Sequence, residues 1–113
     1  MTTKRTTTPS LDGWDITRPE GSEWIPWGEG DKARAKILGS ADDYLVVIVE
    51  AGVGYRATEH PHTHAEFLYV IDGRVRSQGQ ELTSGAGYAA AAGSTHDDFE
   101  ALSPSTYLSV FRV

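Results

Sequence analysis

The segment from residue 54 to residue 73 decides the fold, and it reads Gly54-Tyr-Arg-Ala-Thr-Glu-His60-Pro-His62-Thr-His64-Ala-Glu66-Phe-Leu-Tyr-Val-Ile-Asp-Gly73. Three of the four histidines of the chain stand here at alternate positions, and a glutamate follows at the same spacing. Side chains alternate between the two faces of a strand, so an extended segment can carry all four on one face. A helix would spread them around its circumference, and the proline disfavours a helix further. The spacing therefore predicts a strand that presents imidazole and carboxylate ligands to a metal ion.

The fourth histidine lies in a second stretch, which reads Gly85-Ala-Gly-Tyr-Ala-Ala-Ala91-Ala-Gly93-Ser-Thr-His96-Asp-Asp-Phe-Glu100. Together the two stretches resemble the two motifs of the cupin superfamily. The first motif, G-x5-H-x-H-x3-E-x6-G, is filled without a gap by Gly54, His60, His62, Glu66 and Gly73. The second motif, G-x5-P-x-G-x2-H-x3-N, is filled by Gly85, Gly93 and His96, while Ala91 replaces the proline and Glu100 replaces the asparagine. The resemblance covers roughly residues 37 to 113.

This resemblance implies a metal site, with His60, His62, His96 and Glu66 as the ligands of one divalent transition metal per chain. Fe(II) is favoured because an octahedral ion with these ligands keeps positions for substrate and O₂, which is the arrangement that oxygenases use. Mn(II), Ni(II), Cu(II) and Zn(II) suit the same donors. His64 lies outside the family pattern, and its role stays open between ligand, nearby base and third inward residue. We name His64 and Tyr69 as the candidate catalytic residues, because either could move protons.

The remaining sequence predicts an all-β protein. Runs rich in β-branched and aromatic residues, separated by glycine-containing turns, predict strands at residues 36–39, 44–50, 66–72, 73–77, 80–83, 88–92 and 106–113. Asp72-Gly73 is a strong signal for a hairpin. No segment carries a sustained helical period. The strand pattern indicates a sandwich or barrel, and the cupin resemblance selects the double-stranded β-helix, a jelly-roll barrel with an irregular N-terminal arm.

Three regions follow from this interpretation. Residues 1–12 are rich in threonine and are expected to form a disordered tail. Residues 13–36 contain Trp14, Trp24 and Trp27 and are expected to form an irregular arm that anchors by aromatic burial. Residues 37–113 are expected to form the barrel. Its pocket should be small and largely apolar beyond the metal, with Leu68 and Phe99 among its walls.

Composition restricts the possible partners. The chain has 113 residues, a net charge of −6 and a pI of about 5.0, which disfavours nucleic acid and anionic membrane surfaces. It has no cysteine, so disulfides, thiolate nucleophiles and cysteine-ligated metals are excluded. No signal peptide or membrane-spanning apolar run is visible, and we expect a cytoplasmic protein with a small-molecule substrate. A barrel of this size leaves sheet edges to be covered, so we also expect a homodimer.

The motifs favour one activity and leave two others open. A ligand set of this kind suits a non-heme metal dioxygenase that acts on a small enolisable or phenolic compound, and the resemblance extends loosely to cupins that cleave diketones or hydroxyacetophenones. An isomerase, lyase or cyclase would use the metal only to stabilise an enolate. A non-catalytic binding cupin would hold a small molecule without turnover.

Overall fold

β-Strands make up all the regular secondary structure that the structure shows. The computed structural model describes residues 5–7, 12–57, 60–61, 63–96 and 98–112. Within these ranges the chain forms no helix, as the sequence predicts. The strands are β1 (Arg5–Thr7), β2 (Thr17–Ser22), β3 (Ile25–Pro26), β4 (Ala33–Ala41), β5 (Tyr44–Ala51), β6 (His60–Pro61), β7 (Glu66–Asp72), β8 (Arg74–Ser77), β9 (Gln80–Thr83), β10 (Gly87–Ala90), β11 (Thr95–His96), β12 (Glu100–Ala101) and β13 (Ser105–Arg112).

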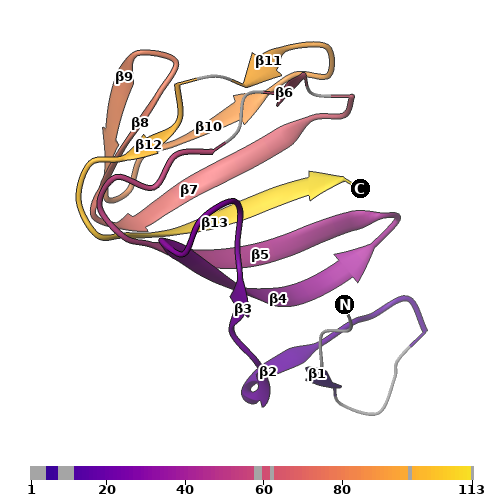
Figure 1. Ribbon diagram of the computed structural model, residues 1–113. Coiled ribbons are helices and arrows are strands. Elements are labelled where there is room, and N and C mark those ends of the chain that lie inside the picture. Colours follow the sequence, from indigo (N-terminus) through magenta and orange to yellow (C-terminus); the bar gives the residue numbers. More distant parts are fainter. Residues whose placement is uncertain (1–4, 8–11, 58–59, 62, 97, 113) are drawn as a thin grey trace.

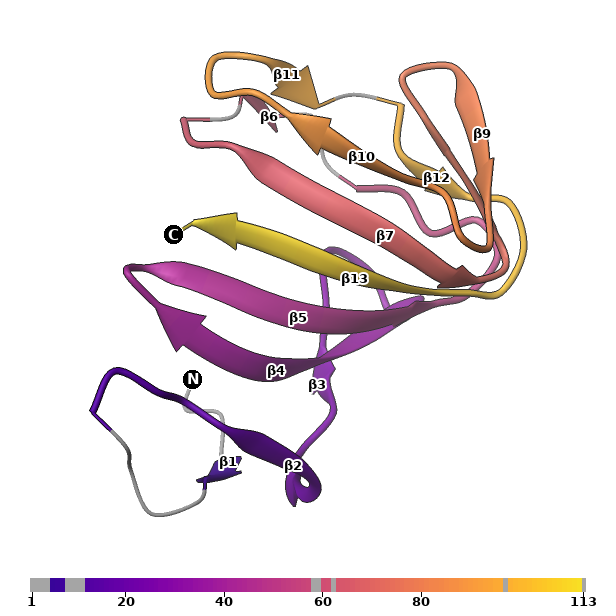
Figure 2. The ribbon, with the colours of Figure 1, turned by 180° about the vertical axis from the view of Figure 1, so that it is seen from behind.

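The strands form one large antiparallel sheet and three small ones. The large sheet has the order β10-β7-β13-β5-β4-β3, and the small sheets are β12-β8-β9, β11-β6 and β1-β2. Figures 1 and 2 show the two small sheets that contain β8 and β6 beside the β10–β7 end of the large sheet, while β1 and β2 lie beyond β4. The sheet that contains β8 contributes side chains to the same core as the large sheet. The interior between these two sheets is where the site lies.

The central strands alternate between buried and exposed side chains. In β5, Val47 and Val49 are buried while Val46 is exposed. β13 lies between β5 and β7, with Tyr107 opposite Val49 on one side and Val70 on the other. One face of each strand therefore points to the interior, and the β-branched residues that favour a pleated strand fill that face.

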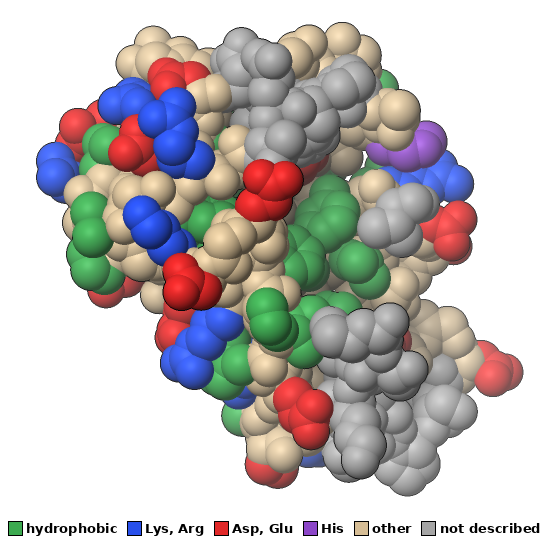
Figure 3. Space-filling model, in the orientation of Figure 1, with side chains coloured by type: hydrophobic (Ala, Val, Ile, Leu, Met, Phe, Trp, Pro, Cys, Tyr) green, Lys and Arg blue, Asp and Glu red, His purple; other side chains and the backbone are tan. Residues whose placement is uncertain are grey.

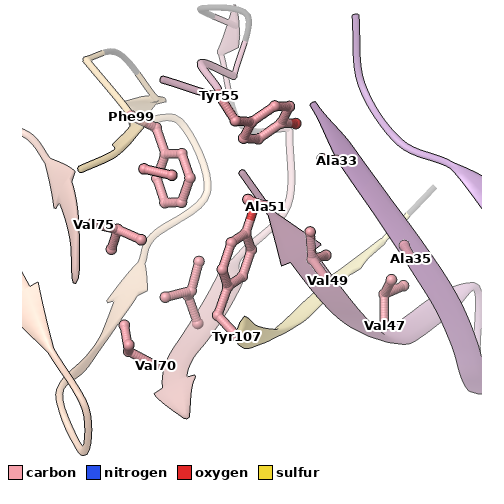
Figure 4. Packing of buried hydrophobic residues seen from close by; sticks show 12 residues of the cluster. Ala33, Ala35, Val47, Val49, Ala51, Tyr55, Val70, Val75, Phe99 and Tyr107 are labelled. Carbon is pink, nitrogen blue, oxygen red and sulfur yellow. The ribbon is translucent and has the colours of Figure 1, made fainter. Parts of the chain in front are cut away.

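The core consists mainly of small side chains. Figure 4 shows Val47, Val49 and Tyr107 from the large sheet packed toward Val75 and Phe99 of the opposite side. The remaining members of the cluster are Ala33, Ala35, Ala51, Tyr55, Leu68, Val70 and Ala101. Because alanine and valine fill so much of this layer, the two sheets do not close completely, and space remains for a cavity.

The predicted hairpin at Asp72-Gly73 is wrong. β7 belongs to the large sheet and β8 to the sheet β12-β8-β9, so the chain crosses from one layer to the other at this point. Gly73 has a φ of 90° and lies so close to Pro104 and Ser105 that a Cβ atom would overlap both. The Arg74 N–H donates to the Ser105 Oγ at 3.1 Å, and this Oγ donates to the Arg74 carbonyl at 3.0 Å. Glycine serves here as a corner between sheets.

The N-terminal segment is attached to the large sheet through β3 and β4. The Arg34 guanidinium lies over the Trp24 ring, 4.2 Å from the centre of that ring. Trp27 packs on Phe111 with ring centres 6.0 Å apart. Trp14 is 69% exposed. Residues 1–4 and 8–11 of the expected tail lie outside the described residues, and Arg5–Thr7 pair with β2 as β1. The expected boundary between residues 36 and 37 falls inside β4, which begins at Ala33.

Candidate functional site

Glu66, the expected carboxylate ligand, is the first residue of β7 and shares a face with the core. Leu68 and Val70, two and four residues further on, are buried. Phe67 and Tyr69, the residues between them, are exposed. Because faces alternate along a strand, Glu66 has the inward parity. This is the arrangement that the alternating histidines and glutamate predict for this end of the segment.

His60 and His96 come together although the two motifs are far apart in the sequence. β6 and β11 pair in antiparallel fashion, and the backbone of His96 lies directly opposite that of His60. His62 lies outside the described residues, as do residues 58, 59 and 97. The β6–β11 pair therefore brings together the backbones of one histidine from each motif.

The two candidate catalytic residues lie at the surface. His64 is exposed in the bend that precedes β7. Tyr69 is 49% exposed on the outward face of β7, opposite the inward parity of Glu66 and Leu68. Their proton-transfer roles stay predictions, and the interior offers other tyrosines.

An interior cavity of about 330 Å³ lies beside Glu66. Figure 3 shows hydrophobic side chains gathered in a hollow near the middle of one face of the molecule. The described walls of the cavity come from β7, β13, the residues after β3 and the residues around β12. They are Trp27, Gly28, Tyr55, Ala57, Glu66, Leu68, Phe99, Tyr107, Ser109 and Phe111. Leu68 and Phe99 are thus walls, as the sequence predicts. The cavity is of a size for a small organic molecule.

Tyr88 was missed as a partner of the candidate ligand. It lies on β10 opposite Leu68 of β7, and its hydroxyl donates a hydrogen bond to Glu66 Oε2 at 3.3 Å. Burial, and next the negative charge of Glu66, raise the pKa of Tyr88 well above its ordinary value, so its phenol stays protonated. The sequence shows that Tyr88 and His96 both stand at even positions. It does not show the register between β10 and β7.

Tyr88 also lines a second cavity, of about 360 Å³, between β9 and β10. Its neighbours there include Ser77, Leu82, Gly87 and Ala90. A groove of about 400 Å³ lies at the opposite end of the sheet, beside Arg34, Glu50 and Asp72, and is lined by none of the predicted site residues. The cavity beside Glu66 is smaller in volume than these two, but it is the one whose described lining contains a predicted ligand.

An ion-pair network holds the loop that follows His96. Arg76 Nη2 contacts Glu100 Oε1 at 2.7 Å and Asp98 Oδ1 at 3.2 Å, and Arg56 reaches the same Glu100 oxygen at 3.6 Å. The hydrogen bond to Asp98 is the main reason that the pKa of Arg76 is raised. These contacts tie β8 to the chain on both sides of Phe99, a cavity wall.

The predicted ligands are chemically suited to a metal ion. Three imidazoles and a carboxylate suit a divalent transition metal. Glu66 reaches the interior, and β6 pairs with β11 at His60 and His96. Within the described residues, no group of three or more His, Cys, Asp and Glu is placed to hold a metal ion. His62 is not among those residues. We also find no helix in the described chain that is long and apolar enough to cross a bilayer.

Comparison with known proteins identifies the fold. The profile of the ChrR cupin-like domain family matches residues 14–112. KdgF from a Halomonas species is 26% identical, with a TM-score of 0.66 over 80% of this chain and 84% of that chain. No curated protein matches the chain.

Solved structures of lower sequence identity have a similar fold. An acetylacetone dioxygenase from Acinetobacter johnsonii is 13% identical, with a TM-score of 0.75 over 95% of this chain and 78% of that chain. The complex of Rhodobacter sphaeroides SigE with the anti-sigma ChrR gives 20% identity and a TM-score of 0.67 over 83% of this chain and 51% of that chain. At these identities the likeness shows the fold alone. The predicted cupin jelly roll is confirmed.

Proposed function

We propose a function from one premise: the chain belongs to the ChrR cupin-like domain family, whose profile spans residues 14–112. The function that the site supports best is that of a metal-dependent dioxygenase acting on a small, uncharged enolisable or phenolic compound. The cavity beside Glu66 carries this proposal, because it sets one carboxylate among mainly apolar walls. Its described lining contains no lysine or arginine, so it is poorly suited to a sugar phosphate.

Four residues would hold the metal, namely His60, His62, His96 and Glu66. Fe(II) is our first choice, because oxygenases commonly hold it with histidine and carboxylate ligands that leave open positions. When bound, the metal would supply Lewis acidity toward an enol or phenol oxygen and a position for O₂ beside it.

The residues of the chain have separate roles in this proposal. Tyr88 donates to Glu66 and so fixes the direction in which its other oxygen points. Leu68, Phe99 and Phe111 surround the substrate with apolar surface and keep bulk water away from it. The ion pairs of Arg76 hold the loop that carries Phe99.

A 1,3-diketone is the substrate that we favour. The fold likeness to an acetylacetone dioxygenase supports this choice. Cleavage breaks the bond between the central carbon and one carbonyl carbon, and each fragment takes one atom of O₂, giving a carboxylic acid and an α-ketoaldehyde. The substrate supplies the electrons, so no external reductant is required.

Oxygen consumption tests this proposal. Protein loaded anaerobically with Fe(II) should consume one O₂ per molecule of 2,4-pentanedione in an oxygen electrode, while the same protein loaded with Zn(II) should consume none. Catechol serves as the phenolic test compound. If the Fe(II) protein consumes no oxygen with either compound, it is not the dioxygenase that we propose.

A non-catalytic binding cupin is the second candidate, and membership of the ChrR cupin-like family favours it. The ChrR neighbour was solved in complex with SigE, which is a property of that protein. Tight binding of the diketone to the Fe(II) protein without oxygen uptake would support this candidate. Conversion of the diketone under nitrogen would instead indicate an isomerase, lyase or cyclase.

A further inference from the structure

Two largely buried tyrosines line the cavity, and their hydroxyls have no hydrogen-bond partner among the described residues. Tyr55 and Tyr107 are each only 4% exposed, and both line the cavity beside Glu66. Within the part of the chain that the structure describes, neither hydroxyl makes a hydrogen bond. Because both residues line the cavity, a molecule bound there can accept a hydrogen bond from each phenol.

Both rings are held firmly. Tyr107 stands in the middle of β13, and Phe99 meets it edge-on with ring centres 5.4 Å apart. The backbone of Tyr55 is fixed by its N–H to the Gly52 carbonyl at 3.1 Å and by its carbonyl, which accepts from the Ala101 N–H at 2.8 Å. Figure 4 shows the Tyr107 ring rising from its strand toward Tyr55. The two phenols are therefore preorganised, and little entropy is lost when they bind a ligand.

Space for the Tyr55 hydroxyl depends on a glycine. Gly28 lies against this hydroxyl so closely that a Cβ atom at position 28 would overlap it. The residue belongs to the segment between β3 and β4, so the arm forms part of the wall behind Tyr55. The hydroxyl is thus confined between the arm and the cavity.

The two phenols act as neutral donors. Burial raises the pKa of both tyrosines, so their hydroxyls keep their protons near neutral pH. The described walls contain one carboxylate, Glu66, and no basic side chain. A ketone or enol oxygen of a small molecule accepts a hydrogen bond from a phenol, and the mainly apolar walls around the two hydroxyls suit such a compound.

We propose that Tyr55 and Tyr107 form the recognition pair for the substrate, each donating a hydrogen bond to a carbonyl or enol oxygen of a small 1,3-dicarbonyl compound. This inference rests on the proposed function for the class of substrate, but it concerns binding and not the reaction with oxygen. Its consequence is that 2,4-pentanedione loses affinity when the hydroxyl of either tyrosine is removed.

Phenylalanine substitutions test the pair, because they remove one oxygen atom and keep the ring. We would measure anaerobic binding of 2,4-pentanedione to the Fe(II) protein by calorimetry, with metal content determined for each variant. Tyr107→Phe and Tyr55→Phe should each raise the Kd for pentanedione about 3- to 10-fold, the value of one hydrogen bond, with a similar rise in KM. Tyr44→Phe, at the start of β5 and outside the cavity lining, is the matched control and should leave the Kd unchanged.

The outcomes separate this inference from the proposed oxygenase. If the protein binds pentanedione without consuming oxygen and both variants bind it more weakly, the recognition pair stands and the oxygenase assignment fails. If the protein consumes oxygen but both variants keep the wild-type Kd and KM, the recognition pair is wrong and the oxygenase stands. Absence of binding by the wild-type protein overturns both.

Discussion

At the scale of single residues, the site shows how strongly one side chain depends on another. Glu66 has one oxygen engaged by the Tyr88 hydroxyl, and that hydroxyl comes from a different strand. Such a contact limits the rotation of a carboxylate. Tyr55 and Tyr107 differ from Tyr88, because their hydroxyls have no hydrogen-bond partner among the residues that the structure describes. Two phenols and one carboxylate thus line the cavity, and a third phenol, on β10, binds that carboxylate.

Removing the Tyr88 hydroxyl should loosen the candidate ligand. We expect Tyr88→Phe to weaken Fe(II) binding by about 10-fold or more, because the Glu66 carboxylate then loses a donor that orients it. Competition with a colorimetric chelator measures this affinity, and Tyr44→Phe again provides the control. An unchanged affinity in Tyr88→Phe would show that Glu66 is not a ligand or that Tyr88 does not orient it.

The histidines give a direct test of the metal set. We expect His62→Ala and His96→Ala to lose stoichiometric metal, while His64→Ala retains it because His64 is exposed before β7. Elemental analysis of protein purified without added metal, before and after anaerobic iron loading, decides each case. Stoichiometric metal in both of the first two variants would refute the ligand assignment.

At the scale of elements, the sequence identifies strands better than their partners. β7 spans residues 66–72 as predicted, because its alternation between apolar and exposed residues is local information. The Asp72-Gly73 signal misled for a physical reason: a positive φ at glycine serves a hairpin and a corner between sheets equally well, and the close approach of Pro104 is not visible in the sequence. Likewise the sequence predicts on which face of β7 the Glu66 side chain lies. The contacts of Tyr88 and Tyr107 depend on register, which only the assembled sheets fix.

The Gly73 corner should be intolerant of any side chain. Gly73→Ala should lower the free energy of unfolding by at least about 2 kcal/mol, because a positive φ and a steric overlap act together. Gly85→Ala is a close control, since Gly85 has a φ of 92° and no atom within 4 Å of a Cβ position. Urea denaturation followed by circular dichroism measures both. Equal losses in the two variants would mean that the contact with Pro104 contributes nothing.

At the scale of the whole molecule, the outer face of the large sheet is apolar. Phe67, Val110 and Val46 lie side by side across β7, β13 and β5, and the next row contains Tyr69, Leu108 and Ile48. Among these, Phe67, Tyr69 and Val46 count as exposed. An apolar surface of this kind commonly marks an interface.

We therefore expect a homodimer in which this outer face contributes to the interface. Light scattering at micromolar concentration should give twice the chain mass of 12.3 kDa. Phe67→Glu combined with Tyr69→Glu should give monomers, because burying these charges without partners is costly. Val53→Glu, at a position that is 61% exposed and away from this face, should stay dimeric. A monomeric wild-type protein would refute the expectation.

The place of β13 sets the order in which the molecule can assemble. It is the last of the described strands in the chain, yet it lies between β5 and β7 and hydrogen-bonds to both. A ribosome therefore releases residues 44–51 and 66–72 well before the strand that joins them, and both edges wait without a partner. Pairings between distant segments form slowly. During that interval the apolar residues 45–49 are open to pairing with other nascent chains, so the yield of folded protein depends on how fast the final strand docks.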